Sequence, residues 1–184
     1  MMLVANFLRE RPAETISILY GMIVAQARLP HFYRDYRVPD TVNGRFDLLV
    51  LHLALFLRRL GSEPEAVRAL GQGVFDAFCQ DMEQNLREMG VGDLKVPREM
   101  RHIGAAYFGR ARAYETALTA ADSETLSAAL ARNVYGTDAP VAGARLAAYM
   151  RDAASVLAAQ DAVTFTRGEL HFPDPAAVAG PVIR

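Results

Sequence analysis

The stretch VPDTVNGRFDLLVLHLALFLRRLG, residues 38–61, decides the fold of this chain. Apolar side chains fill residues 46–57 except at Asp47 and His52. This run covers 12 residues, whereas a membrane span needs about 20. A helix that is apolar on all sides lies inside a protein. The stretch therefore predicts a buried helix around which the rest of the chain packs.

Helical patterns extend outward from this centre in both directions. Asp40 or Thr41 can cap the central helix, and Gly61 can end it. In the flanking segments apolar residues recur every three or four positions, and prolines or glycines separate one segment from the next. Ser123 is in a position to cap the fifth helix. The predicted helices cover residues 14–27, 40–60, 63–89, 97–121, 123–135 and 141–159.

The C-terminal segment has a different pattern. VTFTRGELHF, residues 163–172, alternates apolar and polar side chains, which predicts a small β-hairpin or an extended arm. An isolated hairpin is marginally stable in water, so this segment must pack on the helices or on a partner. The predicted fold class is all-α, a single compact bundle of about six helices. One domain, 1–184, comprises an N-terminal segment 1–12, a helical core 14–160 and a tail 163–184.

Composition excludes several classes of protein. The 184 residues are 52% hydrophobic and 22% charged, as in ordinary globular domains. A net charge of −1 argues against binding nucleic acid through general phosphate attraction. The single cysteine, Cys79, cannot form an internal disulfide and fits a reducing compartment. The first residues match neither a signal peptide nor an organelle-targeting peptide, so we expect a cytoplasmic protein.

The polar residues of the helices form no recognisable catalytic or metal-binding pattern. His52 has no ligand-bearing residue three or four positions away, so we expect a hydrogen-bonded core histidine. Asp76 and Asp81 lie roughly 140° apart around their helix, and Asp81 and Glu83 roughly 160°, which favours a solvated face over a magnesium site. We therefore expect no catalytic residue, cofactor or metal ion. The alternative is a helical enzyme acting on a prenyl-like substrate, with a pocket lined by two or more carboxylates.

Two glycines and an aspartate stand between the third and fourth helices, in LREMGVGDLKVPREM, residues 86–100. Gly90 or Gly92 can adopt the left-handed conformation that ends a helix. Asp93 can bond the freed backbone groups of the turn, and Pro97 suits the first turn of the next helix. We interpret this turn as a geometric device that places two helices side by side, with direct contact to a binding partner as the alternative.

Charged residues also gather near the ends of the helices. Asp40 precedes the central helix and Asp47 lies in its early turns, where the helix end favours negative charge. Arg45, Arg58 and Arg87 are candidates to pair with such carboxylates. The alternative is a recognition surface built from the FYRDYRVPDT loop and the glycine turn.

Four long segments resemble the ubiquinol–cytochrome c chaperone family. They are YGMIVAQARLPHFY (20–33), VPDTVNGRFDLLVLHLALFLRRL (38–60), FDAFCQDMEQNLREMGVGDLKVPREM (75–100) and YFGRARAY (107–114). They occur in the family's order and together span residues 20–114, about half of the chain. Motifs of this length are far more specific than a short pattern.

The resemblance implies a non-enzymatic assembly factor for ubiquinol–cytochrome c reductase, respiratory complex III. Family members are similar to a mitochondrial chaperone that works near the ribosomal tunnel exit and binds newly made cytochrome b together with a small partner protein. The implied partners are therefore nascent cytochrome b, the ribosome near the tunnel exit and a small partner protein, without specific nucleic acid. The chain looks like a bacterial member that acts in the cytoplasm and comes transiently close to the membrane.

Nascent helices of a membrane protein expose apolar surface, which an apolar surface edged with polar groups can cover. The aromatic and arginine-rich loop is our candidate for this surface, because such residues are favoured at interfaces. Its members are Phe32, Tyr33, Arg34, Tyr36, Arg37, Val38 and Pro39. The alternative for Phe32 and Tyr33 is that they anchor the loop to the core. A further alternative function is a peripheral membrane scaffold anchored by residues 1–12.

Overall fold

The computed structural model describes residues 2–120, 122 and 124–178, with side chains from residue 13 onward. Within these residues the chain is helical and contains no strand, which confirms the all-α class. The elements are α1 (Met2–Ala27), α2 (Pro30–Arg34), α3 (Val42–Leu60), α4 (Glu65–Glu88), α5 (Val96–Thr119), α6 (Glu124–Tyr135), the 3-10 helix η1 (Pro140–Gly143), α7 (Ala144–Ala159) and α8 (Ala162–Thr166). The predicted cap at Ser123 lies outside the described residues.

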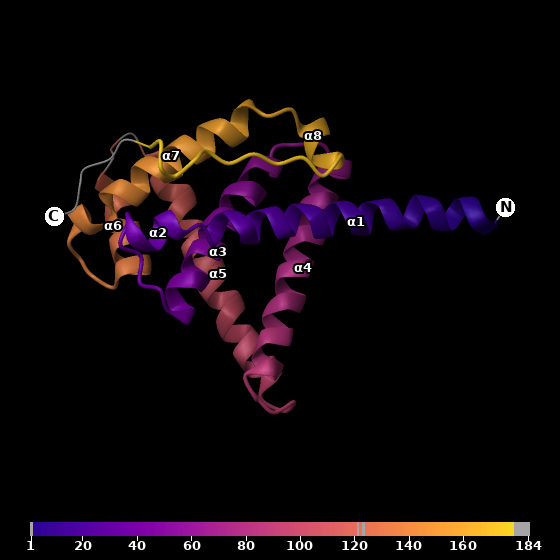
Figure 1. Ribbon diagram of the computed structural model, residues 1–184, viewed down its shortest axis with the longest axis horizontal. Helices are drawn as coiled ribbons and strands as arrows, with labels where there is room; N and C mark the ends of the chain where they lie inside the picture. The colour runs from indigo at the N-terminus through magenta and orange to yellow at the C-terminus, as the bar shows by residue number, and fades with distance from the viewer. Residues whose placement is uncertain (1, 121, 123, 179–184) are drawn as a thin grey trace.

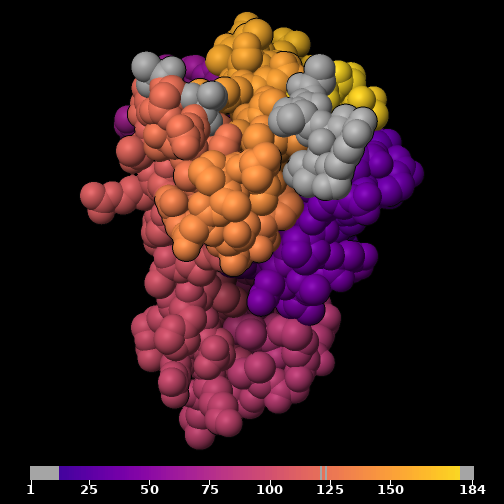
Figure 2. Space-filling model, turned by 90° about the vertical axis from the view of Figure 1, so that its left-hand side faces the viewer, coloured from indigo at the N-terminus to yellow at the C-terminus, as the bar shows by residue number. Residues whose placement is uncertain are grey.

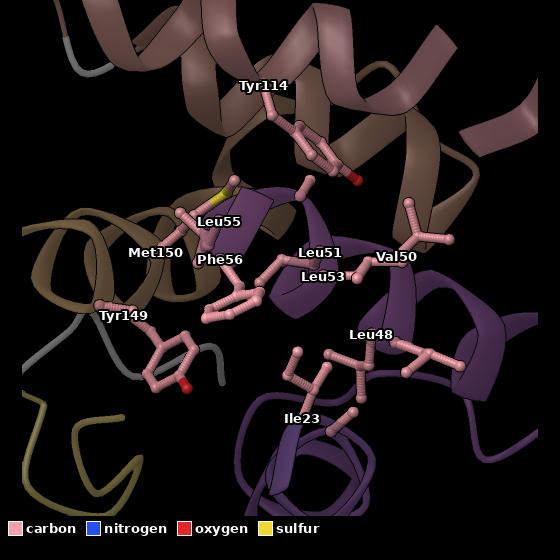
Figure 3. Close-up of a cluster of buried hydrophobic side chains, with 14 of the residues drawn as sticks. Ile23, Leu48, Val50, Leu51, Leu53, Leu55, Phe56, Tyr114, Tyr149 and Met150 are labelled. Carbon is pink, nitrogen blue, oxygen red and sulfur yellow. The ribbon is translucent and has the colours of Figure 1, made fainter. Parts of the chain in front are cut away.

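The central helix is α3, as predicted. Every residue from 47 to 56 is buried, and α1, α4, α5, α6 and α7 all pack against this helix. Its N-terminus is capped by Thr41, whose hydroxyl oxygen accepts a hydrogen bond from the backbone N–H of Gly44 at 3.1 Å. Figure 3 shows α3 side chains such as Phe56 packed among Ile23 of α1, Tyr114 of α5 and Tyr149 of α7.

Helices α4 and α5 form a V whose tip points away from α6 and α7 (Figure 1). Helix α1 crosses α4 above this tip and packs against α4. No helix in the described part of the chain combines the length and the hydropathy that a bilayer span requires.

The tip of the V is the predicted glycine turn. Gly90 has φ +82°. The N–H of Gly90 donates to the carbonyl of Arg87, and the N–H of Val91 donates to the carbonyl of Leu86, each at 3.0 Å. This pattern is a Schellman motif, in which glycine follows the last helical turn. Gly92 is not in the left-handed region, so Gly90 alone fills the predicted role.

The polar groups of this turn differ in part from the prediction. The carboxylate of Asp93 forms an ion pair with the Arg87 guanidinium, and it accepts no hydrogen bond from a described backbone group. The same guanidinium contacts Glu83 at 2.8 Å. Pro97 lies in the first turn of α5, which begins one residue earlier at Val96. An arginine in the last turn of α4 can satisfy a nearby carboxylate more strongly than a backbone N–H can, because both groups are charged.

A Gly90→Ala variant should lose about 1 kcal/mol of folding free energy, because an L side chain is strained at positive φ. The matched control is Gly92→Ala, which has neither a positive φ nor any atom within 4 Å of the added Cβ. Thermal melting should show a midpoint about 2–4 °C lower for Gly90→Ala alone. Equal midpoints for the two variants would contradict this account of the turn.

The predicted β-hairpin at residues 163–172 is wrong, whereas the extended arm is present. Asp161 caps the short helix α8, with its carboxylate accepting from the N–H of Val163 at 2.9 Å. Gly168, at φ +77°, then ends this helix with a second Schellman pattern. One helical turn thus buries Phe165 against Phe56, with ring centroids 5.6 Å apart. The turn satisfies its own backbone groups, whereas a strand would need a paired neighbour.

The arm after α8 is held by side chains. Gln160 donates to the carbonyl of His171 at 2.8 Å and accepts from its N–H at 2.9 Å. Gln26 donates to the carbonyl of Pro173 at 3.0 Å, and the Tyr36 hydroxyl donates to that of Pro175 at 2.7 Å. These side chains replace the bonds that a partner strand would supply, so the arm packs on the helices as expected for a segment that cannot stand alone.

Candidate functional site

The predicted recognition loop is largely an anchor for α2. Phe32, Tyr36 and Val38 are buried, so the expectation that they form an exposed surface is wrong. The ring of Phe32 lies 4.9 Å from that of Tyr149 and 5.3 Å from that of His52. Burial of an aromatic side chain stabilises the folded chain, because it removes a large apolar area from water. The alternative, that Phe32 anchors the loop, is confirmed.

Tyr33 is half-buried, and its hydroxyl donates to the carbonyl of Ala27 at 3.1 Å. Arg34, Arg37 and Pro39 are exposed. Arg37 has φ +60°, and the residues on either side of it point into the core. Only these outer residues of the loop are open to a partner.

His52 is a hydrogen-bonded core residue, as predicted. Its Nδ1 lies 2.7 Å from the carbonyl of Leu48, which can only accept, so Nδ1 carries the proton. Its Nε2 then accepts from the Tyr149 hydroxyl at 2.8 Å, and this hydroxyl accepts from Gln26 at 3.0 Å. Complete burial lowers the pKa of His52 to about 4, and the bond to Leu48 opposes that shift.

A groove of about 850 Å³ runs along the inner sides of α4 and α5. The start of α3 and the ends of α1 and α6 close its upper part. The start of α3, the α4–α5 pair and the end of α6 border it. On the face shown in Figure 2, indigo and purple N-terminal segments meet the magenta α4–α5 pair. We call this feature the groove; its apolar lining consists of Val24, Ala27, Val42, Phe46, Leu49, Met82, Leu86, Met89, Ile103, Ala106, Val134 and Tyr135.

Part of this apolar lining is open to solvent. Val42 is 71% exposed and Met89 is 61% exposed, while Met82 and Ile103 are half-buried. Methionine has an unbranched, flexible and polarizable side chain that adapts to surfaces of different shape. A partly open cleft lined by apolar side chains is a surface that another molecule can cover.

A buried ion pair stands in the wall of the groove. Arg110 lies 2.8 Å from Asp47, whose carboxyl is almost fully buried. Burial raises the pKa of Asp47, and the charge of Arg110 opposes this effect. The guanidinium of Arg110 also stacks over Phe46, 5.6 Å from the ring centre. This pair holds the inner face of α5 against α3.

The expected partners of the arginines are partly confirmed. Arg45 pairs with Asp40 at 2.7 Å, as predicted. Arg58 instead reaches Glu115 of α5 at 2.6 Å, and Asp47 takes Arg110, which the sequence reasoning did not consider. Sequence spacing along one helix cannot reveal a partner on another helix.

Three carboxylates line the groove, those of Asp47, Asp81 and Glu99. The enzyme alternative therefore meets the criterion of two or more carboxylates in one pocket. However, Asp81 accepts hydrogen bonds from Tyr20 at 2.6 Å and from Asn85 at 3.1 Å, and Asp47 faces Arg110. Among the described residues, no three histidines, cysteines or carboxylates gather closely enough to hold a metal ion.

The groove itself was not predicted. Met82, Leu86 and Met89 recur at helical spacing along α4, which is typical of a face that packs on a core, but in this half of the helix they line the groove. The apolar spacing on both helices is compatible with a groove, since amphipathic helices on both sides of a tight turn can diverge. The pattern does not specify the angle between them.

The described part of the chain is thus all-α and has an open cleft lined largely by apolar side chains. The sequence profile described as ubiquinol-cytochrome C chaperone matches residues 34–172, and the chain belongs to this family. The crystal structure of the Cbp3 homolog from Brucella abortus is 35% identical, with a TM-score of 0.86 over 97% of this chain and 100% of that chain.

Animal proteins are more distant relatives. Ubiquinol-cytochrome-c reductase complex assembly factor 1 of Xenopus laevis is 25% identical over 116 residues, which cover 63% of this chain and 58% of that protein. Its namesake from Mus musculus is 24% identical over 117 residues, which cover 64% of this chain and 39% of that protein. The chain thus spans little more than half of the frog protein and less of the mouse protein.

Proposed function

We propose that this chain is a non-enzymatic assembly chaperone that binds newly made cytochrome b and supports assembly of ubiquinol–cytochrome c reductase. The groove is the proposed client site. The observation that carries this proposal is the partly exposed apolar lining of the groove in a member of a chaperone family. The animal relatives are named as assembly factors of the same complex, which supports the assignment.

The size of the groove limits what it can cover. Its lining on α5 extends from Glu99 to Arg110. At about 1.5 Å per residue this is roughly 16 Å, or three helical turns. A membrane-spanning helix is about 30 Å long, so the groove shelters about half of one span. Such a site suits a client that is held briefly and then transferred.

Exposed residues outside the groove are further candidates for contact with the client. Arg34, Arg37 and Pro39 are exposed residues that precede α3, and together with Tyr33 they are our candidates for additional client contacts. The proposed setting is the bacterial cytoplasm, near the ribosomal tunnel exit and close to the membrane. A small partner protein is part of the same proposal.

Acidic substitutions in the groove should abolish assembly. A Met82→Asp/Met89→Asp variant places two charges on the client surface, which should weaken binding at least about tenfold, since desolvating an unpaired polar group costs about 1–3 kcal/mol. Leu94→Asp is the matched control, because Leu94 is 98% exposed and lies outside the groove.

Each variant would replace the chromosomal copy in the source cells. Cytochrome b is then measured by its reduced-minus-oxidised spectrum and complex III by native electrophoresis. The groove variant should lose both signals, and the Leu94 variant should retain them. Normal complex III with a groove variant that melts like the wild type would refute the proposal.

A further inference from the structure

One end of the groove carries an excess of positive charge. Arg28, Arg45 and Arg132 line this end, which we call the arginine end. Arg45 is paired with Asp40. Within the described part of the chain, no carboxylate lies within 4.0 Å of the side-chain nitrogens of Arg28 or Arg132. Two guanidinium groups of the described chain therefore border the groove without an ion pair, although Asp81 also lines the groove and lies near Tyr20, as Arg28 does.

The three arginines come from different helices but from one region of the fold. Arg28 stands between α1 and α2, and Arg45 lies in the first turn of α3. The last turn of α6 is tied to the segment between α2 and α3, because the hydroxyl of Tyr135 donates to the carbonyl of Tyr36 at 2.8 Å, and it lines the same groove. Arg132 lies in this same turn of α6.

The opposite end of the groove has a different character. Met89 and the first turns of α5, with Glu99 and His102, border it beside the Gly90 turn. Glu99 has no ion-pair partner among the described residues. Among the described residues, the groove thus has an acidic side chain without an ion pair at one end and two arginines without ion pairs at the other.

Such an arrangement discriminates between the two directions of a bound helix. The C-terminus of a helix carries about half a negative charge and the N-terminus about half a positive charge. An aspartate or glutamate near the C-terminus adds a full negative charge, which arginine binds through paired hydrogen bonds.

From this charge distribution we infer that the groove binds its client helix in one direction. The C-terminal end of the helix, with an acidic residue in or just after its last turn, meets Arg28 and Arg132. The N-terminal end lies toward the Gly90 turn. This inference rests on the proposed client site and specifies which segments of a membrane protein that site accepts.

Binding of labelled peptides to the full chain tests the direction. Three apolar helical peptides of about 12 residues would have glutamates at the C-terminus, glutamates at the N-terminus, or lysines at the C-terminus. Fluorescence anisotropy at low salt should show that the first binds about tenfold more tightly than the other two, and added salt should reduce the difference. In the Arg28→Gln/Arg132→Gln variant the preference should disappear.

Arg98→Gln/Arg112→Gln is the matched control, because it removes the same charge from exposed positions outside the groove. This control should keep the preference. Equal binding of all three peptides would overturn the inference and leave the groove as a client site. Binding of none would overturn both. If dihexanoylphosphatidylglycerol displaced the first peptide only when Arg28 and Arg132 were present, the arginine end would instead be a lipid headgroup site.

Discussion

A Gly143→Ala variant should lose about 3 kcal/mol of folding free energy, because the added Cβ has no room. It would lie 2.1 Å from the carbonyl oxygen of Ser127 and 2.8 Å from the backbone nitrogen of Ala131. Both atoms belong to the backbone of α6, which cannot move aside as the end of a side chain can. Either η1 or α6 must shift, and Leu146, Leu130 and their buried neighbours shift with it.

Gly104→Ala is the matched control. Gly104 lies within α5, and a Cβ there would meet no atom within 4 Å. Alanine in a helix interior is better than glycine by roughly 0.5–1 kcal/mol, so this variant should be slightly stabilised. Urea unfolding gives both free energies. A Gly143→Ala midpoint equal to that of the wild type would show that the close approach of η1 to α6 is misplaced.

Stability should fall by about 3 kcal/mol between pH 7.5 and pH 4 through His52 alone. The pKa of this histidine is about 4 in the folded chain and 6.5 when unperturbed. Between these values the unfolded chain binds the proton and the folded chain does not, so acid favours unfolding. The loss begins near pH 6.5 and is complete near pH 4.

His52→Gln isolates this effect, because glutamine has no proton to gain in this range. The buried carboxyl of Asp47, whose pKa is raised, acts in the opposite direction, and the lowered pKa values of Asp35 and Asp40 matter only in stronger acid. These groups are common to both proteins, so they cancel in the comparison. The variant should lose about 2 kcal/mol less than the wild type between pH 7.5 and pH 5. Parallel losses would mean that His52 titrates normally.

Periodicity and breakers predicted the long helices α3 to α7, whereas α1 begins at Met2 instead of residue 14, and the short helices α2 and α8 were not predicted. The central helix, its Thr41 cap and the glycine that ends α4 follow from local rules, because each depends on residues close in sequence. The family resemblance found in residues 20–114 is confirmed by a profile match that covers residues 34–172.

Features that depend on distant residues could not be predicted in this way. Alternation around Gly168 suggested a hairpin, but the arm is held by Gln160, Gln26 and Tyr36, which no local pattern identifies. The loop aromatics were expected at the surface because their burial depends on Tyr149, which lies more than 100 residues further along the chain.

The candidate site shows the same limit. Met82 and Ile103 each lie among apolar residues that recur at helical spacing, and either pattern alone is typical of core packing. Only the divergence of α4 and α5 from the Gly90 turn leaves part of both stripes open and creates the groove (Figure 1). Helix α1 packs on α4, and α3 packs on both α4 and α5, so the angle depends on contacts between segments far apart in the sequence.

The most direct test of the proposed client site is photocrosslinking in living cells. A photoreactive phenylalanine would replace Met82 or Ile103 in the groove, and Phe108, a 62% exposed residue outside the groove, would serve as the control position. Irradiation during synthesis of complex III should link cytochrome b to both groove positions and not to position 108. Capture of cytochrome b only from position 108, or from none of the three, would contradict the account.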